Sequence, residues 1–179
     1  MSCGHISTLP SYVKYHDIFA LPYAPNPFII DISTLKQRFR EAQAICHPDS
    51  WASKGSNQQD VAQALSARIN EAYQSLLNPL SRAEYLLRRH HIPVSETDQL
   101  EDMELMAEVI EARETIEDAE HSKDIDVLIE NNQLLIQNTI DELEVLVGKQ
   151  QWEKVKAKTI RLRYLENISR AAKTWLDNH

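Results

Sequence analysis

Apolar residues recur along most of the chain at steps of three and four, which is the period of one face of an α-helix. Asp31 offers an N-cap for the first long helix, and Pro48 ends it, because proline disfavours helical geometry in the residue before it. The expected helices span residues 31–47, 58–78, 80–89, 100–120, 122–147 and 150–176, with a loop over 50–57. Two long helices joined by a short loop favour an antiparallel hairpin, and the last three favour an up-down-up bundle.

Prolines and polar residues mark the limits of these two groups of helices. Residues 1–30 hold four of the 7 prolines, so only the stretch from Tyr15 to Leu21 has room for more than one helical turn. A polar stretch over residues 93–99 is the best linker in the chain. The expected layout is an irregular arm over 1–11, a first domain over 12–92, the linker, and a second domain over 100–179.

Composition narrows the class of protein. The 179 residues include only 3 Gly, which argues against a sheet rich in tight turns and against a glycine-rich phosphate-binding loop. No run approaches the roughly 20 apolar residues that a membrane span requires. The 2 Cys supply neither a disulfide framework nor a four-ligand metal site. The sequence therefore predicts an all-α globular protein with no cofactor, no metal and no membrane partner.

Charge is distributed unevenly between the segments. The net charges are +2 for residues 1–95, −15 for residues 96–147 and +5 for residues 148–179, which together give the −8 of the whole chain. The acidic segment would repel phosphate, so we expect no nucleic-acid partner. The simplest interpretation is that the acidic helices are solvated and pack against the basic C-terminal helix.

The most informative motif is His47-Pro48-Asp49, which stands between the two helices of the predicted hairpin. Lys36, Arg40 and Gln43 fall on one face of the preceding helix, nearly opposite its apolar face. A basic face beside a loop with an imidazole and a carboxylate suits docking to an acidic partner. It does not suit catalysis, because no nucleophile or enclosed pocket is predicted beside it.

A helix, a His-Pro-Asp loop and a second helix resemble the J domain, through which co-chaperones stimulate ATP hydrolysis by DnaK-type heat-shock chaperones. Further segments resemble the HscB family, the J proteins dedicated to iron-sulfur cluster biogenesis. These segments are residues 69–73 (INEAY), 78–80 (NPL), 82–87 (RAEYLL), 105–106 (LM), 111–114 (EARE) and 161–165 (RLRYL). The resemblance covers nearly the whole chain.

The resemblance implies an L-shaped arrangement of a J domain and a three-helix bundle. It also implies a protein that is not itself an enzyme: it would bind the iron-sulfur scaffold, deliver it to a DnaK-type chaperone, and activate that partner's ATPase. Residues 64–68 (ALSAR) are most similar to fungal mitochondrial members. We therefore expect the mitochondrial matrix, with a presequence already removed because no Arg-rich transit peptide is visible, and the bacterial cytoplasm is the alternative.

Two departures from the family pattern change the expectations. Many J domains have basic residues directly after the Asp and shortly before the His, whereas this chain has Ser50, Ile45 and Cys46, so chaperone docking is expected to rest on a thinner basic face. Animal members carry a pair of Cys-x-x-Cys motifs that resemble a zinc site. This chain offers only Cys3 and His5 at that end, too few ligands for tetrahedral zinc.

The first helix of the bundle has a wider apolar face than a bundle needs. On a helical wheel, the apolar residues of 103–116 span about half of the circumference, whereas a stripe a little over 100° wide suffices. Each of these residues taken singly is best explained as core, but together some should stay exposed. The family's scaffold surface corresponds to Leu105, Met106, Val109 and Tyr164. Ile160 and Ile168 also fall outside the inward face of the last helix.

Two rival functions remain open at this point. A J protein that recruits a different client would keep the loop and lose the cluster pathway. An all-helical enzyme would have to use the carboxylates of the bundle, but Glu101, Glu104, Glu108 and Glu111 step along one helix with no His or Cys nearby. Binding to an iron-sulfur scaffold would distinguish the cluster co-chaperone from a J protein with another client. Catalytic turnover by this protein without a chaperone would support the enzyme.

Overall fold

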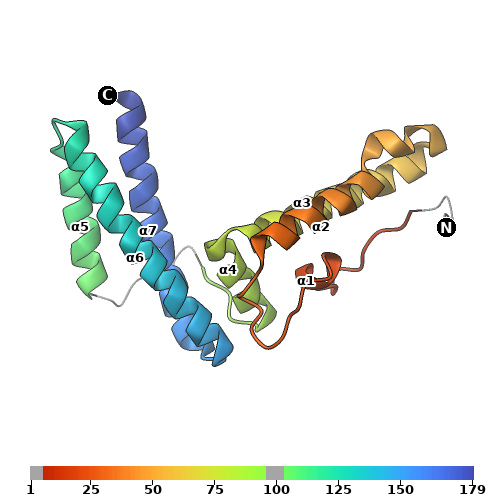
Figure 1. Cartoon of the computed structure of the whole chain (residues 1–179), viewed down its shortest axis with the longest axis horizontal. Coiled ribbons are helices and arrows are strands. Elements are labelled where there is room, and N and C mark those ends of the chain that lie inside the picture. The colour runs from red at the N-terminus through yellow and green to blue at the C-terminus, as the bar shows by residue number, and fades with distance from the viewer. Residues whose placement is uncertain (1–5, 96–102) are drawn as a thin grey trace. The chain divides into compact units, whose positions relative to one another are not determined.

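The computed structural model describes residues 6–95 and 103–179, and every regular element in these two ranges is a helix (Figure 1). The elements are α1 (Tyr15–Ile18), α2 (Ile32–Cys46), the 3₁₀ helix η1 (Pro48–Lys54), α3 (Ser56–Leu77), α4 (Pro79–Arg89), α5 (Met103–Glu117), α6 (Ser122–Gly148) and α7 (Trp152–Asn178). The all-α prediction is confirmed. Within the same ranges, no helix has the length and apolar character needed to cross a membrane.

The predicted hairpin is formed by α2 and α3. The side chain of Asp31 accepts a hydrogen bond from the amide of Ser33 at 2.9 Å, which confirms the predicted cap. Leu35 is fully buried on the face that packs against α3. The rings of Phe39 and Tyr73 stack with centroids 3.9 Å apart, which fixes the spacing of the two helices.

The segment between α2 and α3 differs from the predicted loop over residues 50–57. It forms η1, and α3 already begins at Ser56. The physical reason is local: the fixed ring of Pro48 suits the first position of a helix, and the amide of Ser50 donates to the carbonyl of His47 at 3.0 Å. Gly55, with a φ of 98°, separates η1 from α3 in a backbone conformation that favours glycine.

Contacts divide the chain into two compact units, Met1–Arg82 (unit 1) and Ala83–His179 (unit 2). Unit 1 contains the arm, α1 and the α2–α3 hairpin. Unit 2 contains the end of α4 and the three helices of the predicted bundle. Residues 96–99 of the predicted linker lie outside the described residues, and the domain limits 12–92 and 100–179 stay predictions.

Unit 2 is built on the long α6–α7 hairpin, against which α5 packs. Leu105 and Val109 of α5 meet Leu165 and Ile168 of α7 in a buried cluster. Asn132 of α6 is also buried, and its amide nitrogen donates to the carbonyl of Leu165 at 2.8 Å. This bond ties α6 to α7 at the level of α5.

Candidate functional site

The His47-Pro48-Asp49 motif lies at the turn from α2 into η1, in unit 1. His47 adopts an extended conformation, with φ −60° and ψ 124°, because Pro48 follows it. Its side chain is 57% exposed and that of Asp49 is 90% exposed. The His47 Nδ1 and Asp49 Oδ2 atoms are 3.7 Å apart. The motif therefore presents an imidazole and a carboxylate to solvent side by side, which is the geometry of a contact surface.

The backbone around this motif is held by a side chain that sequence reasoning missed. The indole nitrogen of Trp51 donates to the carbonyl of Ile45 at 2.9 Å, so η1 is tied back to the last turn of α2. The only signal in the sequence was a tryptophan within a stretch predicted to be a loop. With this bond the loop is a short ordered turn rather than an open connection.

Gln43 ties the same end of α2 to α3. Its amide nitrogen donates to Asn70 Oδ1 at 3.0 Å, and Ser66 Oγ donates to Gln43 Oε1 at 3.0 Å. Gln43 therefore faces α3 and is not part of an open basic face. Because amide and hydroxyl bonds have defined directions, they set the position of the turn relative to both helices.

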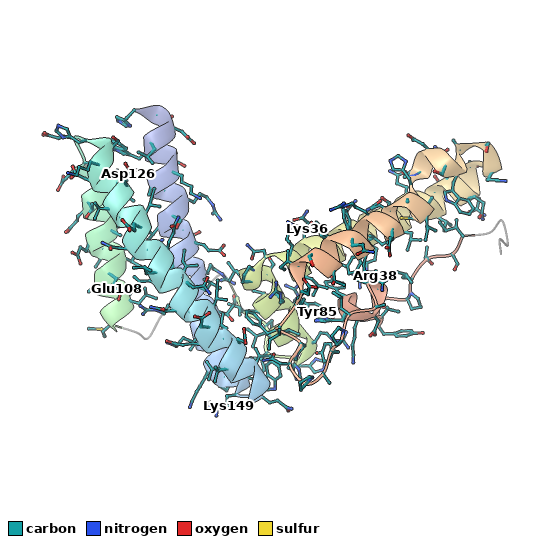
Figure 2. The ribbon with its side chains drawn as sticks, viewed as in Figure 1. Lys36, Arg38, Tyr85, Glu108, Asp126 and Lys149 are labelled. Carbon is teal, nitrogen blue, oxygen red and sulfur yellow. The ribbon has the colours of Figure 1, made fainter. Side chains whose placement is uncertain are left out.

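The helix α2 carries three cationic side chains, which lie on two different sides of the helix. Lys36 and Arg40 are exposed and four residues apart, so they share one side of the helix. Arg38 points away from Lys36 (Figure 2) and pairs with Glu41 at 3.2 Å. Lys36 and Arg40 have no ion pair with any residue in the described ranges. They form a basic surface on α2, which lies roughly 10 to 17 Å before the motif along the helix axis.

The residues described by the structure contain no cluster of three or more His, Cys, Asp or Glu side chains suited to a metal ion. Cys46 is buried, as predicted, and burial raises the pKa of its thiol above the ordinary value. A buried thiol with a raised pKa is a poor nucleophile. Cys3 and His5, the only candidates for a ligand pair, lie outside the described residues.

The four residues predicted to bind the scaffold fall into two groups in unit 2. Leu105 is fully buried and Val109 is 8% exposed, so both are core residues, which is how each apolar residue of this helix taken singly was best explained, and their role in scaffold binding stays a prediction. Both are buried because α5 turns these positions toward both α6 and α7. Met106 is 42% exposed, and Tyr164 is partly buried against the same core cluster.

The exposed apolar part of α5 is instead a ridge formed by Met103, Met106 and Ile110, which are 84%, 42% and 53% exposed. Steps of three and four place these residues on one line along the helix. On α7, Ile160 and Ile168 are buried, although the wheel placed them outside the inward face. A helix covered from more than one side buries more than a single stripe.

An ion pair fixes α5 on α7, and its carboxylate, Glu108, lies on the side of α5 roughly opposite this ridge. Arg161 Nη2 lies 2.9 Å from Glu108 Oε2, and the Arg161 side chain is 15% exposed. Glu108 was one of the carboxylates considered for an enzyme, and its partner is a structural cation rather than a catalytic group. Figure 2 shows Glu108 on the flank of the bundle.

Comparisons with known proteins agree with this geometry. A family model described as "HSCB C-terminal oligomerisation domain" matches residues 101–173. The "Co-chaperone protein HscB" of Proteus mirabilis strain HI4320 is 34% identical over 157 residues, which cover 85% of this chain and 91% of that protein. The human "Iron-sulfur cluster co-chaperone protein HscB" is 29% identical over 175 residues, covering 96% of this chain and 73% of that protein.

The fold agrees as well. The crystal structure of human co-chaperone protein HscB superimposes with a TM-score of 0.89 at 25% identity, covering 96% of this chain and 86% of that one. Sequence and fold thus point the same way over both units. With more than 30% identity over nine-tenths of the bacterial relative, the chain belongs to the HscB family of co-chaperones.

Proposed function

We propose that this protein is a J-type co-chaperone that binds the scaffold of iron-sulfur cluster assembly and delivers it to a DnaK-type chaperone. The observation that carries the proposal is the exposed His47-Pro48-Asp49 turn at the end of a rigid helical hairpin. The name of the human relative supplies the cluster pathway. The protein itself would catalyse no reaction and would act by stimulating the chaperone's ATPase.

Chaperone docking would use the motif together with Lys36 and Arg40. The two cations would attract an acidic chaperone surface and orient the encounter. The imidazole of His47 and the carboxylate of Asp49 are then free to contact groups that control hydrolysis. Their contribution would be specific contact with the chaperone, because both side chains are largely exposed to solvent.

Scaffold binding would use the apolar ridge of α5 with the neighbouring edge of Tyr164. Met106 supplies an adaptable apolar contact, and Tyr164 supplies an aromatic ring with a polar tip. Leu105 and Val109 would contribute indirectly, because their packing in the core holds α5 and its exposed ridge in position. Aromatic and apolar anchors surrounded by charged side chains are typical of a protein interface.

The two surfaces would act together by proximity. A protein that holds the scaffold and contacts the chaperone raises the effective concentration of the scaffold's recognition peptide at the chaperone, without any new contact between them. The J domain, residues 12–92, would supply the contact with the chaperone, and the bundle, residues 100–179, the contact with the scaffold. The compartment we propose is the mitochondrial matrix.

Steady-state ATPase assays with a matrix DnaK-type chaperone test this function. We expect this protein alone to stimulate hydrolysis, and scaffold with this protein to stimulate it more than the sum of the two separate effects. Binding of the labelled scaffold to the chain, measured in parallel, distinguishes this pathway from a J protein with another client. Stimulation without any binding of the scaffold would exclude the cluster role and keep the co-chaperone role.

A further inference from the structure

The helix α5 is much shorter than the hairpin on which it lies. It has 15 residues, whereas α6 and α7 have 27 each. Figure 1 shows that α5 covers only the part of the hairpin that lies away from the α6–α7 turn. The groove between α6 and α7 therefore continues beyond the part that α5 occupies.

This continuation is a groove of about 520 Å³, which we call the lower groove. Its floor is apolar and consists of Val145, Leu146 and Ala157, of which Val145 is 52% exposed. Its edges are charged, with Asp141 and Glu142 on α6 and Lys154 and Lys158 on α7. Within the described ranges only α6 and α7 line it. None of these seven residues belongs to the motif in unit 1 or to the ridge on α5.

Among the charged side chains around the lower groove, the ion pairs show which one lacks a partner of opposite charge. Lys154, Lys158 and Arg161 follow one another at steps of four and three, so they form one basic edge along α7. Arg161 is paired with Glu108 of α5, and Lys158 is paired with Glu142 of α6. Among the described residues, Lys154 has no acidic partner.

Lys154 is the charged side chain of the groove lining that has neither an ion pair nor a side-chain hydrogen bond among the described residues. Glu142 holds Lys158, and Asp141 accepts a hydrogen bond from the amide nitrogen of Gln137 at 2.8 Å. The C-terminal segment 148–179 also carries 8 basic and 3 acidic residues. An occupant of the groove would therefore gain more from negative charge placed over α7 than from positive charge placed over α6.

The helix α5 shows what fits this kind of groove. It inserts Leu105 into the core between α6 and α7, and three residues later it places Glu108 on Arg161. An apolar residue followed after three positions by a carboxylate therefore satisfies both the floor and the basic edge. The same groove two turns farther along α7 offers an apolar floor again, with Lys154 in the place of Arg161.

We propose that the lower groove binds an acidic amphipathic helix of a partner protein. The helix lays its apolar side chains on Val145 and Ala157 and places a carboxylate on Lys154, because Lys158 already pairs with Glu142. It occupies the α6–α7 groove in the way that α5 occupies the neighbouring part, which is the helix-in-groove mode of recognition. The site is separate from the surfaces of the proposed function and does not depend on them.

The test uses the full chain and two synthetic helical peptides of about 14 residues, long enough for four turns. Both peptides have the same apolar positions, and the charged positions three residues after them are Glu in one and Lys in the other. We expect the Glu peptide to bind at least about tenfold more tightly, because each edge contact is an exposed ion pair of modest strength. Methyl NMR signals of Val145 and Leu146 should shift on binding, while those of Met106 and Ile110 should not.

Two substitutions with matched controls on α7 locate the site. Lys154→Glu should weaken the Glu peptide about fivefold or more, whereas Lys173→Glu should leave its affinity unchanged. Ala157→Tyr should fill the groove and abolish binding, whereas Ala171→Tyr should not; both alanines are exposed, so the fold should tolerate the larger ring. Equal affinity for the two peptides, shifts at Met106 instead of Val145, or unchanged binding to Ala157→Tyr would each overturn the proposal.

Discussion

Arg82 Nη1 donates a hydrogen bond to the carbonyl oxygen of Phe28 at 2.7 Å, although the two residues are 54 positions apart in the chain. The same guanidinium donates to the carbonyl oxygens of Leu76 at 2.7 Å and Leu77 at 3.3 Å, at the end of α3. The Arg82 residue is only 6% exposed. One buried cation thus joins the segment between α1 and α2 to the hairpin that presents the motif.

Replacing Arg82 should destabilise unit 1. Burial lowers the pKa of the guanidinium to about 10, so the group is still charged at neutral pH. The free-energy cost of burying this charge is offset by its hydrogen bonds to the three carbonyl oxygens. In Arg82→Met the carbonyls lose their donors inside the protein, which should cost about 2 to 4 kcal/mol. Urea unfolding followed by circular dichroism measures the loss. Arg88→Met on the exposed side of α4 is the matched control, and an equal loss in both variants would contradict this role.

His16 should make the stability of unit 1 sensitive to acid. The ring is fully buried, with Nε2 2.9 Å from the carbonyl oxygen of Pro27, and burial lowers its pKa below the ordinary 6.5. The unfolded chain takes up the proton first, so the stabilisation is complete above the ordinary pKa and is lost as the pH falls below it. The melting temperature should therefore fall from about pH 7 to about pH 5.

The His16→Phe variant isolates this effect, because it keeps a ring and removes the titrating group. Its melting temperature should fall less over the same pH range. His121→Gln, at an exposed position, should behave as the wild type. Burial also lowers the pKa of His90 in unit 2, so a part of the slope should survive in His16→Phe. A slope identical to that of the wild type would assign the acid sensitivity elsewhere.

Reversing the charge of both Lys36 and Arg40 to Glu should weaken stimulation of the chaperone. The stimulation by the wild type should also decline with added salt, because exposed charges are screened within about 8 to 10 Å at physiological ionic strength. Arg38→Glu is the matched control, since Arg38 points away from Lys36 and already pairs with Glu41. If the ATPase rates do not change with salt or with the double reversal, Lys36 and Arg40 are solvated side chains that play no part in chaperone docking.

Leu105 and Met106 should separate folding from binding on α5. Leu105→Ala empties a fully buried position and should cost about 2 to 5 kcal/mol of stability. Met106→Ala should cost no more than about 1 kcal/mol of stability, because 42% of the residue is exposed and no fully buried position is emptied, but it should lower scaffold affinity. Thermal melting and scaffold titration measure the two effects. A Met106→Ala variant with unchanged scaffold affinity would remove the ridge from the proposed surface.

The sequence was sufficient to predict the ends of a helix where a single residue determines the backbone conformation. The cap at Asp31 and the end of α2 before Pro48 follow from side-chain chemistry within a few positions, and both are confirmed. The 3₁₀ helix η1 was missed, although Pro48 opens it, because the bond from Trp51 to Ile45 that holds it against α2 cannot be read from residue types alone. A polar stretch with one glycine does not reveal such a bond.

On α5, the periodicity of apolar residues does not predict which of them are buried and which are exposed. The wheel predicted an apolar face wider than a bundle needs, but it could not tell which part α6 and α7 cover. Leu105 and Val109 became core, whereas Met103 and Ile110 stayed exposed beside Met106. Which residues are covered depends on how one helix lies on two others, and a single helix does not encode that.

The basic face of α2 shows a similar limit. Helical spacing placed Gln43 in line with Lys36 and Arg40, but its amide bonds to Ser66 and Asn70 of α3. An amide can serve either as a surface group or as a link between helices, and only the position of the partner helix decides which. The two cations have no such partner in α3 and remain exposed.

The central claim is that the exposed His47-Pro48-Asp49 turn activates a DnaK-type chaperone. The most direct measurement is the steady-state ATPase rate of that chaperone with saturating wild type or His47→Gln. Because His47 lies outside the core, the variant should keep the melting temperature and the scaffold affinity of the wild type. The account predicts that the chaperone rate with His47→Gln falls to its basal value, and a rate equal to that with the wild type would contradict it.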